Sequence, residues 1–216
     1  MRRPTVLAGV GGIAFSVLTV VAFSVANPPG GTYTASDSVD YVAKGHRAAV
    51  FVSTYLALLA VLGLICLLRY LRDAISVAAN NHRATRTFWG IGLAAAVTFA
   101  VGWGILLGDA LAHAYGGRHV VIAPAVTYLI SEVGVVMIFG PGAILLGVAL
   151  VALMLGSRTA LPTWLRWLTL VAGVAGVASP AYFPFFIVEI WGIVIGVWLL
   201  AAGGGFKSAV AAQPSA

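Results

Sequence analysis

Two apolar stretches separated by a few polar residues decide the fold of this chain. Residues 88–114 read FWGIGLAAAVTFAVGWGILLGDALAHA, and residues 123–156 read APAVTYLISEVGVVMIFGPGAILLGVALVALMLG. Each is long enough to cross a bilayer as a helix, because about 20 residues at about 1.5 Å per residue span the hydrocarbon core. The polar residues 115–119 between them predict a hairpin of two membrane helices.

The composition of the whole chain points to lipid as its solvent. Of the 216 residues, 61% are hydrophobic and only 8% are charged, whereas soluble domains have roughly 25% charged residues. The alternating pattern of a transmembrane β-barrel does not occur in the sequence. Helices satisfy their own backbone hydrogen bonds in lipid. We therefore predict an all-α polytopic membrane protein.

Apolar runs, their glycine and proline stops and the flanking basic residues predict a bundle of six transmembrane helices. The residues between the first two, 27–44, read as a polar loop. The first apolar run also fits a signal peptide with Ser24-Val-Ala26 as its cleavage site, but its length favours a retained helix. The expected helices span about residues 5–26, 46–69, 87–114, 123–156, 163–180 and 184–203, in a single transmembrane domain of residues 1–207 followed by a disordered tail, residues 208–216.

The basic residues are distributed unevenly between the two sides of such a bundle. One side has only Lys44, Arg47 and Arg118. The positive-inside rule places both termini, and the more basic side, in the cytoplasm. The basic residues on the predicted cytoplasmic side are Arg2, Arg3, Arg69, Arg72, Arg83, Arg86, Arg158, Arg166 and Lys207.

This distribution explains the net charge of +6 by membrane topology and anionic lipid heads. Nucleic acid is not an expected partner, since basic clusters with interleaved aromatic residues are missing. The expected partners are the lipid bilayer and either another membrane protein or a second copy of the chain. The richness in Ala, Val, Gly and Arg suggests a bacterial protein of the plasma (inner) membrane.

Small residues recur at every fourth position of the helix expected at 87–114. Such spacing lets two helix backbones approach closely in lipid, so we expect a close-packed seam. Asp109 and His113 each follow a stripe residue by one position and would flank this seam. The stripe consists of Gly92, Ala96, Ala100, Gly104, Gly108 and Ala112.

The helix expected at 123–156 contains Gly140-Pro141-Gly142 near its middle. Proline removes a backbone hydrogen bond and kinks a helix, and the flanking glycines favour a real break. Two interpretations stay open. The segment is a packing kink, or it is a discontinuous helix of the kind that lines binding sites at mid-bilayer.

The scarce ionisable residues inside the apolar helices are the candidate functional site, because charge in lipid is costly. The predicted topology places all of them in the outer half of the bilayer. Two tyrosines lie at depths where their hydroxyls need partners. This polar cluster consists of Asp109, His113, Glu132, Glu189, His46, Arg47, Tyr55 and Tyr128.

Three interpretations of the cluster remain open. In the first, Asp109, His113, Glu132 and Glu189 bind a divalent metal such as zinc, iron or manganese, which suits carboxylate and imidazole ligands. In the second, Glu132 and Glu189 bind protons, a cation or an organic solute, as a carrier would. In the third, Arg47 or His46 pairs with a carboxylate and the network only fixes the helices.

No sequence motif indicates a soluble enzyme. There is no phosphate-binding glycine loop, nucleophile elbow or HExxH. The single cysteine, Cys66, excludes an intrachain disulfide. We therefore expect a membrane protein that binds or transports a small solute, ion or proton, or that serves as an assembly subunit, with a membrane-embedded metalloprotein or metalloenzyme as the alternative.

Overall fold

The computed structural model describes residues 3–29, 32–79, 82–115, 122–156 and 161–202. Within these ranges the chain is helical and has no strand, so the prediction of an all-α fold is confirmed. Most of the predicted polar turn and the whole of the predicted tail lie outside the described residues.

Six of the helical segments correspond to the predicted ones. They are α1 (Arg3–Ala26), α3 (Lys44–Ala79), α4 (His82–Tyr115), α7 (Thr163–Val177), α8 (Phe185–Ala201) and the one segment that α5 (Pro124–Met137) and α6 (Ala143–Gly156) form together. Four apolar stretches, Arg3–Ala26, His46–Ser76, Ala84–Tyr115 and Pro124–Gly156, are long enough to cross a membrane. The chain is therefore a helical protein of membrane character, in which the apolar helices α7 and α8 are shorter than these four stretches.

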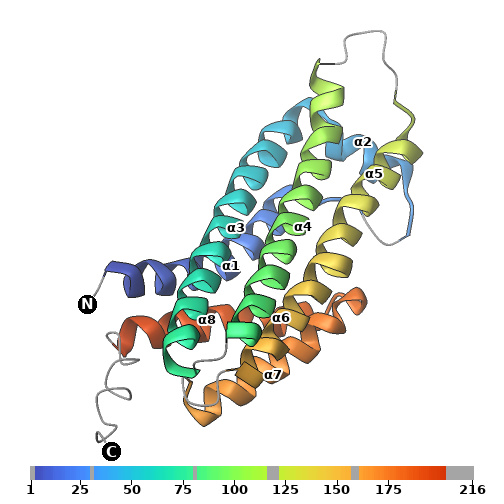
Figure 1. Cartoon of the computed structure of the whole chain (residues 1–216). Coiled ribbons are helices and arrows are strands. Elements are labelled where there is room, and N and C mark those ends of the chain that lie inside the picture. The colour runs from blue at the N-terminus through green and yellow to red at the C-terminus, as the bar shows by residue number, and fades with distance from the viewer. Residues whose placement is uncertain (1–2, 30–31, 80–81, 116–121, 157–160, 203–216) are drawn as a thin grey trace, which may run out of the picture.

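The helices pack as a ring of neighbours that closes on itself. Helix α1 packs along α3, α3 against α4, α4 against α5 and α6, α6 against α7, and α7 against α8. Helix α8 then returns to α1, so the two ends of the described chain lie in one packed unit. Figure 1 shows α3, α4 and the α5–α6 segment side by side as the long elements, with α1 behind α3 and α4.

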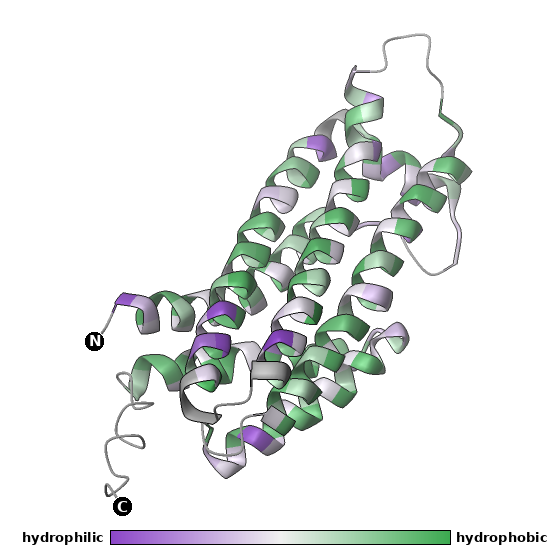
Figure 2. Cartoon of the chain, viewed as in Figure 1, coloured by the Kyte–Doolittle hydropathy of each residue, from purple (hydrophilic) through white to green (hydrophobic). Residues whose placement is uncertain are grey.

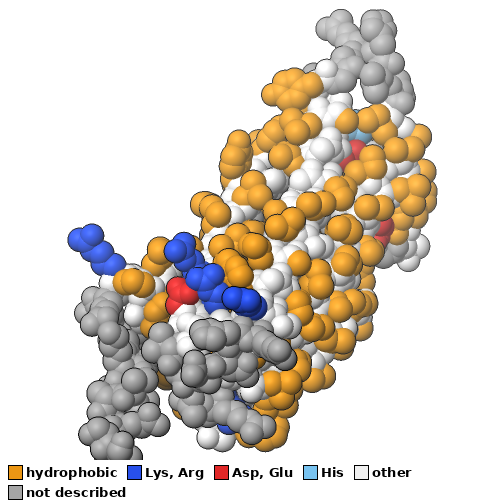
Figure 3. Space-filling model, in the orientation of Figure 1, with side chains coloured by type: hydrophobic (Ala, Val, Ile, Leu, Met, Phe, Trp, Pro, Cys, Tyr) orange, Lys and Arg blue, Asp and Glu red, His pale blue; other side chains and the backbone are white. Residues whose placement is uncertain are grey.

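The outer surface of this ring is apolar, as a surface in contact with lipid must be. Leu59 on α3, Val97 on α4 and Val174 on α7 are 53%, 56% and 59% exposed. Figure 2 shows hydrophobic residues along the length of the helices, and Figure 3 shows apolar side chains covering the visible side of the bundle. The described arginine side chains gather mainly at one end.

A short helix, α2 (Ala35–Val42), forms where the sequence analysis expected only a loop. Its buried residues are Ser38, Tyr41 and Val42, which share one face because positions three and four apart are neighbours on a helix. This face packs against α3, α4 and α5. Helix α2 is therefore a cap on one end of the bundle (Figure 1).

The hairpin of α7 and α8 does not reach this capped end. Phe185, at the start of α8, packs against Phe99 in the middle of α4 and against Phe139 in the middle of the α5–α6 segment, with ring centroids 6.0 Å and 5.2 Å apart. Figure 1 shows the hairpin beside the lower part of the long helices only. The expectation that Glu189 lies at the depth of Asp109 is therefore not met, because α8 begins at mid-height.

The small-residue stripe of α4 does not form one continuous seam. A Cβ added at Gly92 would lie 3.0 Å from Leu68 on α3, but one added at Gly104 or Gly108 would have no neighbour within 4 Å. The reason is geometric. A four-residue step turns about 40° beyond a full circle, so the stripe winds off the packed face of the helix after a few steps.

The closest helix contacts use glycines on other helices. A Cβ at Gly63 on α3 would lie 2.6 Å from the carbonyl oxygen of Gly11 on α1, and the reverse distance is also 2.6 Å. Gly147 on α6 approaches the backbone of Gly173 and Gly176 on α7 in the same way. The backbones of these helix pairs are therefore in direct contact, as small-residue packing in lipid allows.

A π-helical turn over Ile138–Gly142 joins α5 to α6. Gly140 has non-helical dihedral angles, φ −84° and ψ −106°, directly before Pro141. Proline clashes with the carbonyl of the fourth preceding residue and gives it no hydrogen bond, and the wider turn accommodates both effects. Gly142 faces inwards, where an added Cβ would lie 3.0 Å from the Phe99 ring.

Candidate functional site

Asp109 is the most deeply buried carboxylate near the capped end. It is 2% exposed on α4, and its side-chain oxygens have no hydrogen-bond partner among the described residues. His113 lies one turn further along, with its Nδ1 atom 3.6 Å from Asp109 Oδ1. The same Nδ1 lies 3.0 Å from the Asp109 carbonyl oxygen. Since that carbonyl can only accept, Nδ1 carries the proton of this hydrogen bond.

Helix α5 carries two buried hydroxyls on the face that brings Thr127 beside Asp109. Thr127 and Ser131 are 1% and 0% exposed, and neither hydroxyl has a hydrogen-bond partner among the described residues. They are four positions apart and so lie on one face of α5. The Thr127 hydroxyl lies beside the Asp109 carboxylate. Buried polar groups are normally paired, so several unpaired ones together indicate a place for a ligand or water.

Tyr41 brings a third hydroxyl to this place from helix α2. Its ring packs in a small apolar cluster with Val42, Val50 and Ala110, which ties α2 to α3 and α4. Its hydroxyl is buried and makes no hydrogen bond to the described residues. Burial, and to a lesser degree the negative charge of Asp109, raises the pKa of the Tyr41 phenol. Tyr41 therefore stays neutral and offers an oxygen and a proton to a ligand.

A cavity of about 310 Å³ opens beside Tyr41 at the capped end of the bundle. Its polar side chains include two exposed carboxylates, Asp37 and Asp40, so its charge is acidic. Tyr41 lines this cavity and also lies near Asp109, so it stands between the two. The cavity is lined by Asn27, Pro28, Pro29, Asp37, Asp40, Tyr41 and His46.

His46 and Arg47 bind backbone carbonyls in this region. His46 Nε2 lies 2.8 Å from the carbonyl oxygen of Ala26, which joins the start of α3 to the end of α1. Arg47 Nε donates to the carbonyl oxygen of Val42 at 2.8 Å. These bonds hold the helix ends that frame the cavity. The predicted pairing of either side chain with a membrane carboxylate is not among these contacts.

Glu132 lies in a different environment, among tyrosines. It is half-buried on α5 and interacts with Tyr128 one turn earlier and with Tyr182 from the α7–α8 turn. Tyr33 packs edge-on against Tyr128 at a centroid distance of 5.2 Å.

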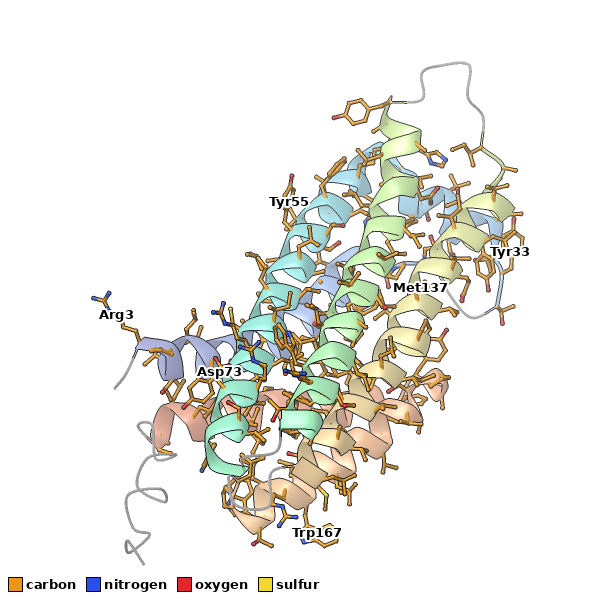
Figure 4. The ribbon with its side chains drawn as sticks, in the orientation of Figure 1. Arg3, Tyr33, Tyr55, Asp73, Met137 and Trp167 are labelled. Atoms are coloured by element: carbon orange, nitrogen blue, oxygen red, sulfur yellow. The ribbon has the colours of Figure 1, made fainter. Side chains whose placement is uncertain are left out.

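Tyr55 takes no part in either group. It is 68% exposed on α3, and Figure 4 shows it pointing away from the bundle on the side opposite Tyr33. A tyrosine in this position faces lipid or the headgroup region, so the prediction that its hydroxyl serves the membrane carboxylates is not supported by its placement.

Glu189 occupies a third environment, between α8 and α1. It is 4% exposed, and the polar side chain beside it is that of Ser16. The four predicted metal ligands thus lie in three separate surroundings. Among the described residues, no three His, Cys, Asp or Glu side chains are close enough to hold a metal ion. The predicted convergence fails because α8 begins at mid-height and carries Glu189 away from α4 and α5.

The sequence analysis missed the oxygen donors around Asp109. Thr127 and Ser131 are four positions apart in an otherwise apolar segment, and this spacing predicts two hydroxyls on one helix face. Tyr41 could have been found from the spacing of Ser38, Tyr41 and Val42, which predicts one buried face. Asp37 and Asp40 fall within residues 27–44, which the sequence predicts as a polar loop.

In comparisons with known proteins, no family model, no curated protein and no solved structure matches this chain.

Proposed function

We propose that the chain is an integral membrane protein that takes up a small monovalent cation from the outer side of the plasma membrane, at Asp109. The observation that carries this proposal is the buried carboxylate of Asp109, whose oxygens have no hydrogen-bond partner among the described residues and which lies beside the hydroxyl of Thr127 and near that of Tyr41. A carboxylate with neutral oxygen donors is the ligand set that hard cations prefer.

The charge of the site favours a monovalent cation. Asp109 supplies a single negative charge, and Glu132 and Glu189 lie in other surroundings. His113 donates its Nδ1 proton to the Asp109 carbonyl oxygen. A divalent ion would keep an uncompensated charge in an apolar bundle, which is costly. The acidic cavity beside Tyr41 would raise the local concentration of cations at the entrance.

The proposed orientation has both termini in the cytoplasm. Arg3, Asp73 and Trp167 lie at one end of the bundle in Figure 4, the end at which Figure 3 shows the arginines gathered. The positive-inside rule makes this end cytoplasmic. The α7–α8 hairpin enters and leaves at this end, so the orientation of the C-terminus is the same whether the hairpin crosses the bilayer completely or only in part.

The test is cation-dependent thermal unfolding of the purified protein in a non-ionic detergent. We expect sodium, lithium or potassium chloride to raise the Tm relative to choline chloride at equal ionic strength. A ligand at 100 times its Kd stabilises by about 2.7 kcal/mol, which corresponds to several degrees for a chain of this size.

Asp109→Asn should abolish this shift, because the neutral amide does not balance a cation. Asp73→Asn is the matched control, since Asp73 is an exposed acid paired with Arg72 at 2.7 Å. A wild-type Tm that is the same in all four salts would refute the proposal. A shift that persists in Asp109→Asn would place the cation elsewhere.

A further inference from the structure

Glu189 is a second buried acid without a partner, far from the cavity at the capped end. Neither of its carboxyl oxygens makes a hydrogen bond to the described residues. It belongs to the inward face of α8, which also buries Val188, Gly192 and Ile195. An acid in such surroundings must be neutral or compensated, because an isolated carboxylate is very costly to bury.

The α1–α8 contact positions one hydroxyl beside this acid. A Cβ at Gly12 on α1 would lie 2.8 Å from the carbonyl oxygen of Gly192, and the Ser16 hydroxyl fills the space beside Gly192. The two helix backbones are therefore in contact here. Ser16 Oγ already donates to the carbonyl oxygen of Gly12 at 3.3 Å, so its lone pairs are free to accept a proton donated by Glu189.

No cation compensates Glu189 from the helices that pack against α8. The helices with the most extensive contacts to α8 are α1 and α7, whose ionisable side chains in the described ranges are Arg3 and Arg166, both in the first turn of their helix. Helix α4 also meets α8 where Phe99 packs on Phe185, but the charged and titratable residues of α4 lie ten or more positions from Phe99 along the helix. From α7, the polar contact to α8 is the hydrogen bond from Trp191 Nε1 to Thr169 Oγ1 at 3.0 Å. A neutral hydroxyl is thus the group that faces the acid.

A layer of aromatic rings separates Glu189 from Asp109. Phe23 packs on Trp103 and on Phe139 at centroid distances of 4.6 Å and 5.1 Å. Phe139 in turn packs on Phe185 at 5.2 Å, and Phe185 on Phe99 at 6.0 Å. These rings come from α1, α4, the π-helical turn and α8, so they close the middle of the bundle. The two acids therefore belong to separate sites.

We propose that Glu189 is a proton-binding site on the cytoplasmic side of the aromatic layer, which takes up and releases a proton with Ser16 as its hydrogen-bond partner. The ligand is a proton because, among the described residues, the site has one acid, one hydroxyl and no group of side chains that could hold a metal ion. In the protonated state the carboxyl O–H donates to Ser16 Oγ, and in the ionised state Ser16 turns to donate to the carboxylate.

The test uses dicyclohexylcarbodiimide, an apolar reagent that reaches acids inside a membrane protein. The protonated carboxyl adds across one C=N bond, its oxygen bonding to the carbon while its proton moves to the nitrogen. Rearrangement to the N-acylurea then gives a stable adduct without a further reactant. The adduct is located by mass spectrometry of peptides from the full-length protein in detergent, treated over a range of pH.

We expect an adduct on Glu189 whose rate of formation falls as the pH rises, and no adduct at this position in Glu189→Gln. Ser16→Ala should shift the midpoint of this pH profile, because the ionised state loses its hydrogen-bond donor. Asp109→Asn should leave the profile unchanged. A water-soluble carbodiimide provides the control, since it should modify exposed Asp73 but not Glu189.

The proposal is overturned if the folded protein forms no adduct at Glu189 at any pH. It is equally overturned if the adduct forms at a rate independent of pH over the range in which the protein stays folded, because a permanently protonated acid is only a structural one. If Glu189→Gln does not fold, the pH dependence of adduct formation in the wild type and in Ser16→Ala still tests the proposal. The cation-dependent Tm tests the Asp109 site independently.

Discussion

Replacing Gly63 by alanine tests whether direct backbone contact between α1 and α3 holds the bundle together. The new Cβ would lie 2.6 Å from the Gly11 carbonyl oxygen, about 0.8 Å short of the 3.4 Å at which ordinary contact begins. The obstacle is backbone and cannot rotate away. The helices must therefore separate, and overpacking of this kind costs about 1–3 kcal/mol.

Gly104→Ala on α4 is the matched control. It makes the same chemical change in the same kind of helix, but the added Cβ would have no atom of another helix within 4 Å among the described residues. Alanine has the higher helix propensity, by at most about 1 kcal/mol. Much of this gain is lost in lipid, where the helices stay formed on unfolding. We expect Gly104→Ala to be neutral or slightly stabilising.

The assay is equilibrium unfolding in mixed micelles with a rising fraction of dodecyl sulfate, followed by the fluorescence of the buried Trp103 and Trp191. Gly11→Ala should resemble Gly63→Ala. The double variant should cost less than the two single costs added, since one separation of the helices relieves both clashes. Equal stability of Gly63→Ala, Gly104→Ala and the wild type would refute the contact.

Three further outcomes are expected. Thr169→Val should destabilise by about 1–3 kcal/mol in the same assay, because the buried indole N–H of Trp191 loses its acceptor; no loss would mean that this bond is not formed. His46→Ala should lower the free energy of unfolding by about 1 kcal/mol, because the hydrogen bond to the Ala26 carbonyl oxygen at the C-terminal end of α1 is lost. An unchanged unfolding curve would contradict this. In a Cys66→Ser background, Phe183→Cys should resist a membrane-impermeant maleimide added outside whole cells, because the α7–α8 turn ends at mid-height; rapid labelling would show that the turn reaches the outer surface.

The sequence predicts the helices of this fold well because the signal is strong and local. Long apolar runs bounded by glycine, proline and arginine specify where most helices begin and end. Helix α2 was missed because its few residues include two aspartates and follow a Pro-Gly stretch. Its buried face depends on Tyr41 meeting Val50 and Ala110 from other helices, and such a contact is not a local property of the sequence.

The candidate site was predicted only in part, for reasons of depth. The sequence indicates Asp109 and His113, since charged groups in an apolar helix stand out. The prediction that Glu189 lies at the depth of Asp109 assumes that every helix crosses the whole bilayer. Phe185 instead meets Phe99 and Phe139 at the middle of the bundle. The helix that carries Glu189 thus starts below the level that its neighbours reach.

The two halves of the bundle differ in the kind of contact that holds them. Away from the capped end, glycines bring α1 against α8 and α6 against α7 at backbone distance, and such packing tolerates little movement. At the capped end, α2 is held by a small apolar cluster, and buried hydroxyls and a carboxylate make no hydrogen bond to the described residues. Loosely held elements open most easily, and a site that exchanges a ligand with water needs such an element above it. The rigid half therefore suits a proton, which moves without displacing helices, and the capped half suits a larger ion that must pass Tyr41.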